Sequence, residues 1–283
     1  MAAPIGSLTL TTDSSATGFY DRNFRRSADE VNAAIRAAAF GEDIGQFSWT
    51  TAEEHRRFQA ELDIGPDSHV LEVASGSGGP ALFLVRSTGC RSVGIDIHAG
   101  GIEAAAEAAL EAELGESAVF LHHDAQQALP FADASFDAVI SIDSMNHLVD
   151  REAVFGEWAR VLKDSGRFLF TDAVVVCGPL RREEMVDRSP AMGEFVFTPA
   201  GWYERVLAEA GFVSIQVEDV TANIVGVAER WHAARVAAEP DLLEMEGAAK
   251  YEEFQRFLST VALVAREGRL GRYAYSGTRP SRS

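Results

Sequence analysis

The sequence has little cysteine and no segment that resembles a secretion signal. It contains two cysteines, Cys90 and Cys177, among 283 residues. Such sparse use is typical of proteins in a reducing compartment rather than of secreted folds held by disulfides, although one disulfide between the two stays open. The first 18 residues have neither a basic start nor a long apolar core, so they do not read as a signal peptide. We therefore expect a cytoplasmic protein.

Long apolar runs and basic clusters are also missing. No apolar run approaches the length of about 20 residues that a membrane helix needs. The chain has 25 basic and 43 acidic residues, which gives a formal charge of −18. Its short basic stretches, RNFRR (22–26) and HRRF (55–58), are flanked by acids. Because an anionic surface repels phosphates, we expect no nucleic acid and no membrane as partner. The sequence leaves open whether the protein is a monomer or a homodimer.

What the sequence does contain is an alternation of short apolar strands with amphipathic helices. Hydrophobic residues make up 47% of the chain, which is enough for one large domain with an appendage. The alternation predicts an α/β fold, a doubly wound, Rossmann-like, mostly parallel sheet of seven strands with helices on both faces. The predicted strands span 69–74, 90–97, 118–123, 135–143, 167–176, 213–220 and 271–280, and the predicted helices span 27–40, 51–62, 80–88, 101–114, 151–166, 199–212, 224–239 and 247–267.

Local signals predict where some helices begin and end. Ser27 with Glu30, and Thr51 with Glu54, form capping-box patterns, and Gly166 is expected to end the helix that precedes it. The long stretch before the last strand has only helical patterns and is too hydrophobic for a linker. We therefore divide the chain into an arm with a helical cap (1–50), a core (51–221), a helical insertion over the ligand edge of the sheet (222–268), and a last strand with a tail (269–283).

The stretch VLEVASGSGGPALFLV (70–85) predicts a strand, a glycine-rich turn and a helix. Ligands of such sheets bind beyond the carboxyl ends of the strands. The dinucleotide pattern spaces its glycines as G-x-G-x-x-G, whereas Gly76, Gly78 and Gly79 are crowded together here. Glu72 ends the strand, and a carboxylate there would repel a pyrophosphate but would suit an ammonium group or a hydroxyl. The loop therefore disfavours a dinucleotide.

Two further acids end the next two predicted strands. Asp96 can accept both hydroxyls of a ribose, and Asp124 can accept from the exocyclic amine of a purine. Alone, each acid also fits an ordinary role, with Glu72 as a helix cap, Asp96 as a loop acid and Asp124 as a turn former. The three acids follow one another in order at successive strand ends. Together they predict a ligand that contains adenosine and a positively charged group but no phosphate.

On these residues the chain resembles the class I S-adenosylmethionine-dependent methyltransferases. The segments VLEVASGSGGPAL, VGIDI, HHDAQQALPFADASFDAVIS and WARVLKDSGRFLFTD resemble successive motifs of that family, over roughly Val70–Phe212. LPFADASFDAVIS is typical of its small-molecule branch, which includes sarcosine/dimethylglycine, phosphoethanolamine and ubiquinone-type methyltransferases. The resemblance implies S-adenosylmethionine as cofactor, S-adenosylhomocysteine as product, an antiparallel last strand and a helical substrate cap.

The resemblance also implies which residues contact the cofactor. It places the loop against the methionine part and the ribose, through Glu72, Ala74, Ser75, Gly76 and Gly78. It places the nucleoside against Asp96 at the ribose diol, Ile97 at the adenine ring, Asp124 at the adenine amine and the Ala125 backbone at a ring nitrogen.

One position in the loop departs from the family pattern. The family has glycine where this chain has Ala74. Alanine is compatible with such a turn when its backbone keeps a negative φ, so we expect a negative φ at Ala74.

Candidate catalytic residues follow the fourth predicted strand. Methyl transfer from a sulfonium is an in-line displacement, so the protein mainly aligns a nucleophile and accepts or shields a proton. Asp143 and His147 are four residues apart and share a face if this segment is a short helix. Asp143 would bind a cationic substrate or the cofactor's amino group, and His147 would act as a base near neutral pH. A structural or capping role stays open for His147.

Three residues near the N-terminus are further candidates. Resemblance to phosphobase methyltransferases implies that Tyr20 pairs with His147 over the substrate, while an ordinary packed tyrosine stays open. Gln46 and Trp49 would close over the methionine end of the cofactor, and a core tryptophan is an equally good account of Trp49.

The sequence gives no reason to expect a metal site. His122 and His123 are adjacent on a strand, so their side chains point to opposite faces. Asp143 and His147 have no third ligand at a suggestive spacing.

The sequence thus predicts an enzyme that transfers a methyl group from S-adenosylmethionine to an N-, O- or C-acceptor of a small metabolite enclosed under a helical lid. One alternative is a nicotinamide-dependent oxidoreductase, which Glu72 and the glycine spacing disfavour. Another is a catalytically silent module that binds the cofactor.

Overall fold

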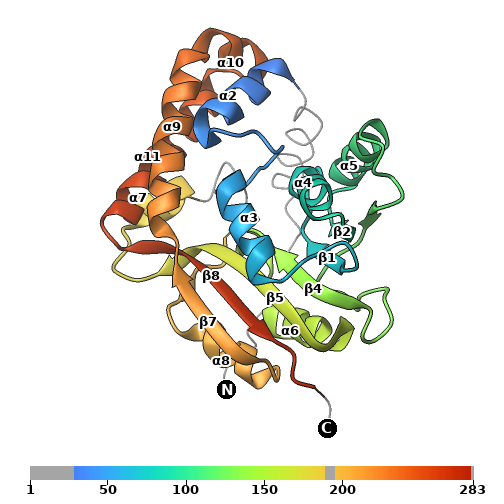
Figure 1. Cartoon of the computed structure of the whole chain (residues 1–283). Coiled ribbons are helices and arrows are strands. Elements are labelled where there is room, and N and C mark those ends of the chain that lie inside the picture. Colours follow the sequence, from blue (N-terminus) through green and yellow to red (C-terminus); the bar gives the residue numbers. More distant parts are fainter. Residues whose placement is uncertain (1–28, 189–194, 282–283) are drawn as a thin grey trace, which may run out of the picture.

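A single mixed sheet organises the computed structural model, which describes residues 29–188 and 195–281 (Figure 1). Its strands are β1 (His69–Val73), β2 (Arg91–Asp96), β3 (Ala118–His122), β4 (Phe136–Ser141), β5 (Leu162–Val176), β6 (Thr198–Pro199), β7 (Val213–Asp219) and β8 (Leu270–Thr278). They follow the order β3-β2-β1-β4-β5-β8-β7, and β6 pairs with β5. Strands β1 to β5 pair with one another in parallel, whereas β8 is antiparallel to both β5 and β7. The predicted doubly wound sheet with an antiparallel last strand is confirmed, and β6 is an additional, eighth strand.

Helices cover both faces of this sheet and extend beyond it. They are α2 (Glu30–Phe40), α3 (Ala52–Glu61), α4 (Gly79–Thr88), α5 (Ala99–Glu111), α6 (Arg151–Val161), α7 (Arg182–Arg188), α8 (Trp202–Glu209), α9 (Thr221–Ala237), α10 (Glu239–Glu246) and α11 (Ala248–Arg266), with a short 3-10 helix η1 (Met145–His147). The short helices α7 and α10 were not predicted. Within the described residues, none of the helices has the length and apolar character needed to cross a bilayer.

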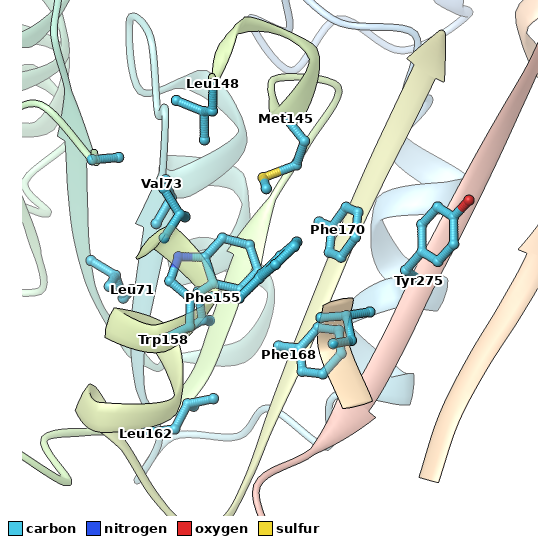
Figure 2. Packing of buried hydrophobic residues seen from close by; sticks show 14 of the residues in the cluster. Leu71, Val73, Met145, Leu148, Phe155, Trp158, Leu162, Phe168, Phe170 and Tyr275 are labelled. Carbon is cyan, nitrogen blue, oxygen red and sulfur yellow. The ribbon is translucent and has the colours of Figure 1, made fainter. Parts of the chain in front are cut away.

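The core has one layer on each face of the sheet. Successive side chains of a strand point to opposite faces. Accordingly Val70 of β1 lies in the cluster under α3, α4 and α5, and Leu71 lies in the cluster under α6 and α8. Figure 2 shows the second cluster, in which Trp158 of α6 packs against Phe168 and Phe170 of β5, with ring centroids 6.3 and 6.0 Å apart. Burial on both faces explains why these strands are almost continuously apolar.

Helices α2, α9, α10 and α11 form a separate layer, which we call the cap. Their apolar sides share one cluster, in which Trp231 of α9 packs against Phe40 of α2 and Phe254 of α11 at ring distances of 5.5 and 5.4 Å. The cluster also includes Trp49 from the loop between α2 and α3, and Ala173 of β5. The cap therefore packs onto the sheet through β5 and the Trp49 loop (Figure 1).

The predicted end of the helix at Gly166 is wrong. Helix α6 ends at Val161, and Leu162 already begins β5, where it pairs with Phe136 of β4. The register between β4 and β5 shifts after this pair, and Ser165 has a φ of 62°. The turn-like residues before Gly166 therefore form an irregularity inside a strand rather than a helix terminus.

One of the two predicted capping boxes falls within the described residues. The Thr51 side chain accepts a hydrogen bond from the Glu54 backbone N–H at 3.2 Å, as an N-cap residue does. The Glu54 carboxylate does not complete the box, because it binds Arg272 instead. Ser27, the start of the other predicted box, lies outside the described residues.

A buried histidine in α3 predicts a pH dependence of stability. Burial lowers the pKa of His55 from 6.5 to about 4. The unfolded chain therefore binds a proton that the folded protein does not, so full stability is present above pH 6.5 and is lost as the pH falls toward 4. We expect His55 to contribute a loss on the order of 3 kcal/mol over this range.

Urea unfolding of the wild type and of His55→Gln between pH 4.5 and 7.5 measures this contribution. The difference between the two unfolding free energies should shrink or reverse toward low pH, because the variant lacks this titration. The exposed Val149 supplies a control without a titrating group, since Val149→Gln should keep the pH dependence of the wild type. Parallel curves for wild type and His55→Gln would contradict the assignment.

Candidate cofactor and acceptor site

The site lies where the order of strands reverses. From β1 the chain proceeds outward through β2 and β3, and it then returns to place β4 on the other side of β1. Ligands of doubly wound sheets bind at such a switch point, beyond the carboxyl ends of the strands. The glycine loop after β1, Asp96 at the end of β2 and Asp143 after β4 all lie at this edge.

The glycine loop turns through three residues with left-handed backbone. The φ angles are 60° at Ala74, 55° at Gly76 and 79° at Gly78. The expected negative φ at Ala74 is therefore wrong: the chain makes the turn that glycine normally makes, with an alanine. A side chain at Gly78 would collide with Ala105 and Phe120, since a Cβ there would come within 2.7 Å of Ala105 and 2.8 Å of Phe120. The loop is thus packed closely against α5 and β3.

Asp96 is fixed by the backbone around it. One carboxylate oxygen accepts the Gly76 N–H and the other accepts the His98 N–H, each at 2.8 Å. The side chain is buried. Each carboxylate oxygen can accept a second hydrogen bond, so Asp96 can receive a ligand diol while it holds the glycine loop against β2.

Glu72 is a buried carboxyl group at the same edge. Burial, followed by the nearby Asp96, raises the pKa of Glu72 to about 8. Among the described residues, its Oε2 and the Ser75 hydroxyl are buried without a hydrogen-bond partner. Buried polar atoms are normally paired, so this part of the loop fits a polar ligand.

The ends of β2 and β3 provide an apolar and a polar group beside Asp96. Ile97 is 54% exposed, although it is large and apolar. Asp124 follows β3, and its Oδ1 accepts the Gln126 N–H at 2.9 Å, while Ala125 is buried. The His123 N–H donates to the Asp96 carbonyl at 2.9 Å, which holds the two strand ends side by side. The structure therefore brings Asp96, Ile97 and the Asp124 segment together.

Asp143 is enclosed in a hydrogen-bonded network. Its Oδ1 accepts from the Arg272 Nε at 2.8 Å and from the Thr171 hydroxyl at 2.7 Å, and its Oδ2 accepts from the Trp49 N–H at 2.8 Å. Asp143 has a φ of 53° and precedes η1 rather than lying within a helix. The expected common helix face with His147 is therefore wrong, yet both residues line one pocket.

That pocket lies between the end of β4 and the cap. His147, at the end of η1, is half-buried, and its ring lies 5.0 Å from the ring of Phe195. Trp49 stacks on Phe257 at 6.0 Å and meets Trp231 edge to face at 5.8 Å. The remaining lining residues are Phe47, Ser48, Asp143, Asn146, Ala173, Val174 and Arg188. Sequence reasoning missed Phe47, Asn146, Arg188 and Phe195, which carry no motif.

Two other candidates have local structural roles, and one is not described. The Gln46 side chain is fully buried, accepts the Ile44 N–H at 2.8 Å and donates to the Glu42 carbonyl at 3.2 Å, so it shapes its own loop. Trp49 is a buried member of the cap cluster as well as a wall of the pocket. Tyr20 lies outside the described residues. Within the described part of the chain, no group of three His, Cys, Asp or Glu side chains is arranged to hold a metal.

Comparison with known proteins identifies the family. Residues 71–170 match a methyltransferase domain family. The sarcosine/dimethylglycine N-methyltransferase of Halorhodospira halochloris is 32% identical over 208 residues, which are 72% of this chain and 70% of that enzyme. The chain belongs to the S-adenosylmethionine-dependent methyltransferases. The resemblance seen in its sequence motifs is thereby confirmed, and S-adenosylmethionine is the cofactor.

Two further similarities extend over most of this methyltransferase. The 27-O-demethylrifamycin SV methyltransferase of Amycolatopsis mediterranei (strain S699) is 29% identical over 230 residues, 79% of this chain and 82% of that enzyme. The fold is similar to that of Haemonchus contortus phosphoethanolamine N-methyltransferase 2 in complex with phosphomonomethylethanolamine and S-adenosylhomocysteine, with a TM-score of 0.78 at 18% identity. That match covers 93% of this chain but 60% of the nematode protein, and at this identity it shows the fold alone.

The strand-end residues of this methyltransferase fit the cofactor. We predict that Asp96 receives the ribose diol, that the exposed Ile97 lies against one face of the adenine, and that the unpartnered Glu72 and Ser75 atoms face the polar methionine part. We therefore expect Asp96→Ala to weaken S-adenosylhomocysteine binding about 100-fold, because two hydrogen bonds to a charged acceptor are lost.

Titration calorimetry of S-adenosylhomocysteine measures this loss directly. The control is Asp67→Ala, which removes an exposed acid from the loop before β1 and should bind as the wild type does. Wild-type affinity in Asp96→Ala would show that the ribose is held elsewhere.

The left-handed Ala74 predicts a stabilising substitution. A non-glycine residue in this region costs about 1–2 kcal/mol, part of which is offset by the greater unfolded-state entropy of glycine. Ala74→Gly should therefore raise the unfolding free energy by about 0.5–1 kcal/mol and retain cofactor binding. Ala106→Gly, at an exposed position inside α5, should instead lower it by about 1 kcal/mol. Chemical unfolding measures the unfolding free energy of the two variants and shows whether each rises or falls. A lower unfolding free energy in Ala74→Gly would show that the Ala74 backbone is not strained.

Proposed function

We propose that this methyltransferase transfers the methyl group to a hydroxyl oxygen of a small, largely apolar metabolite, with His147 as the base that takes the hydroxyl proton. The observation that carries the proposal is the place of His147, which lines an aromatic pocket beyond the end of β4. The Asp143 carboxylate is engaged by Arg272, Thr171 and the Trp49 backbone, whereas His147 lies in the wall of the pocket.

The walls of the pocket support an apolar acceptor. Phe47, Trp49, Trp231 and Phe257 present aromatic surface, with Phe47 6.1 Å from Trp231 in an edge-to-face arrangement. Small-molecule sites are typically lined by apolar and aromatic side chains with a few polar groups that fix orientation. Here η1 itself contributes the polar side chains of Asn146 and His147 to the pocket.

The charges around the pocket disfavour an ammonium substrate. Asp143 has the only carboxylate among the described lining residues, and its oxygens already accept three hydrogen bonds. The buried Arg188 also lines the pocket, with its guanidinium over the rings of Phe257 and Phe195 at 5.2 and 5.5 Å. A guanidinium repels a cationic acceptor, whereas a neutral hydroxyl compound has no such penalty.

The chemistry divides between the cofactor and the chain. When bound, S-adenosylmethionine supplies an activated methyl group on a sulfonium. The chain holds its nucleoside with Asp96 and the glycine loop, and orients the acceptor between the aromatic walls. His147 accepts the hydroxyl proton through its imidazole, which makes the oxygen a better nucleophile. Its backbone N–H donates to the Ser144 carbonyl at 3.0 Å, which fixes the turn that presents the ring.

The cap completes the proposed site. Helices α9 and α11 contribute Trp231 and Phe257 to the pocket, and we assign them the role of a lid that excludes water during transfer. Enclosure of this kind suits a small molecule rather than a macromolecule, and the formal charge of −18 adds repulsion against nucleic acid. The relative named for 27-O-demethylrifamycin SV, a compound that lacks a methyl group on an oxygen, adds support for an O-acceptor.

We expect His147→Ala to bind the cofactor as the wild type does and to lower turnover about 100- to 10,000-fold, because general-base catalysis typically contributes this much. The assay offers methyl-labelled S-adenosylmethionine with panels of hydroxylated, amino and carbon-nucleophile compounds, and carbon NMR of the product identifies the methylated atom. Calorimetry with S-adenosylhomocysteine monitors cofactor binding.

The control for this variant is His232→Ala, which removes a histidine of α9 that does not line the pocket and should retain full turnover. Label recovered on nitrogen or carbon would refute the hydroxyl acceptor. Wild-type turnover by His147→Ala would refute the base while leaving the acceptor assignment intact.

A further inference from the structure

Arg272, near the start of β8, is completely buried and holds two carboxylates. Its Nε donates to Asp143 Oδ1 at 2.8 Å, and its Nη1 lies 2.8 Å from both oxygens of Glu54. Its Nη2 reaches the Thr171 hydroxyl at 3.4 Å. Burial disfavours the guanidinium charge, but the carboxylates of Asp143 and Glu54 nevertheless raise the pKa of Arg272 above its usual value.

The first carboxylate, that of Asp143, connects Arg272 to one wall of the acceptor pocket. Asp143 receives Arg272 on one oxygen and the Trp49 backbone N–H on the other. The Trp49 ring stacks on Phe257 and contacts Trp231. The position of this aromatic wall relative to β4 is thus set through the Asp143 side chain.

The second carboxylate, that of Glu54, connects Arg272 to the cap. Glu54 Oε2 accepts from the Asn223 side chain at 3.1 Å, and the same Asn223 amide donates to the Trp49 carbonyl at 3.1 Å. Asn223 lies in the first turn of α9, the helix that also carries Trp231. The Arg272 backbone adds a further link, since its N–H donates to the Thr221 hydroxyl at 3.0 Å.

We propose that Arg272 is a positioning residue for the acceptor pocket, holding the Trp49 wall and the start of α9 in a fixed relation to the end of β4. The proposal deepens the proposed function, because it rests on the assignment of this pocket to the acceptor. A planar guanidinium can donate in several fixed directions at once, whereas a lysine ammonium is a compact point charge. Arginine is therefore suited to join Asp143, Glu54 and Thr171.

The test compares Arg272→Lys and Arg272→Met with Arg235→Met. Arg235 is a matched control because it is also buried and paired with a carboxylate, Glu246, but it lies at the opposite end of α9 from Asn223. In Arg272→Met, we expect amide hydrogen exchange of the Trp49 peptide and of the first turns of α9 to rise by about tenfold or more. Arg272→Lys should give a smaller rise, and Arg235→Met should leave the Trp49 peptide unchanged.

Calorimetry separates positioning from general damage to the fold. Asp96 and the glycine loop take no part in the network, so S-adenosylhomocysteine affinity in Arg272→Lys should stay within about threefold of the wild type. With an acceptor found by the labelling assay, the same variant should raise KM for the acceptor more than for the cofactor. The hydrogen-exchange and calorimetry measurements require no acceptor. An acceptor that is methylated on nitrogen would therefore refute the proposed function but would leave the positioning role of Arg272 unaffected.

Asn223→Ala keeps the inference falsifiable if the Arg272 variants do not fold. Asn223 is partly exposed, and its removal breaks the bonds to Glu54 and Trp49 without leaving a buried charge unpaired. We expect the same exchange pattern with a smaller rise. Unchanged exchange at Trp49 and α9 in Asn223→Ala would overturn the proposal, and so would loss of S-adenosylhomocysteine binding in Arg272→Lys.

Discussion

One buried guanidinium joins the parts of this enzyme that its chain order separates. Arg272 of β8 meets Glu54 of α3 and Asp143 after β4, which are 218 and 129 residues away in the sequence. Burying three charges carries a large desolvation cost that only close pairing offsets, and removal of one partner from such a site typically costs about 3–5 kcal/mol. The arrangement therefore admits few alternative packings of β8, α3 and the end of β4. Asn223 of α9 connects the cap to these residues by donating a hydrogen bond to Glu54.

The two halves of the site are built by different means. The proposed cofactor half consists of backbone turns and strand ends, with Asp96 holding Gly76 and His98 by their N–H groups. The proposed acceptor half consists mostly of side chains from outside the residues that match the methyltransferase family, including Trp49, Trp231 and Phe257. One enzyme family can thus keep a common cofactor site while its members enclose different acceptors, because function resides in sites carried by the fold.

The sequence predicted the sheet and the identity of the cofactor because both depend on local patterns. A strand shows its period over five or six residues, and the acids Glu72, Asp96 and Asp124 are recognisable by their places at or just after the ends of strands. The contacts of Asp143 could not be predicted, since its partners Trp49, Thr171 and Arg272 come from three other segments. The φ of Ala74 was also hidden, because surrounding structure holds an alanine in a conformation that local preference disfavours.

The assignment of His147 as the base toward a hydroxyl acceptor is tested most directly by a crystal structure that contains both S-adenosylhomocysteine and the acceptor found by the labelling assay. We predict that the acceptor oxygen lies within about 2.6–3.2 Å of a His147 ring nitrogen, between the Trp49 and Trp231 walls, and faces the cofactor sulfur. An acceptor whose reactive atom faces the sulfur but lies beyond reach of His147, or an ammonium group held there by another side chain, would contradict it.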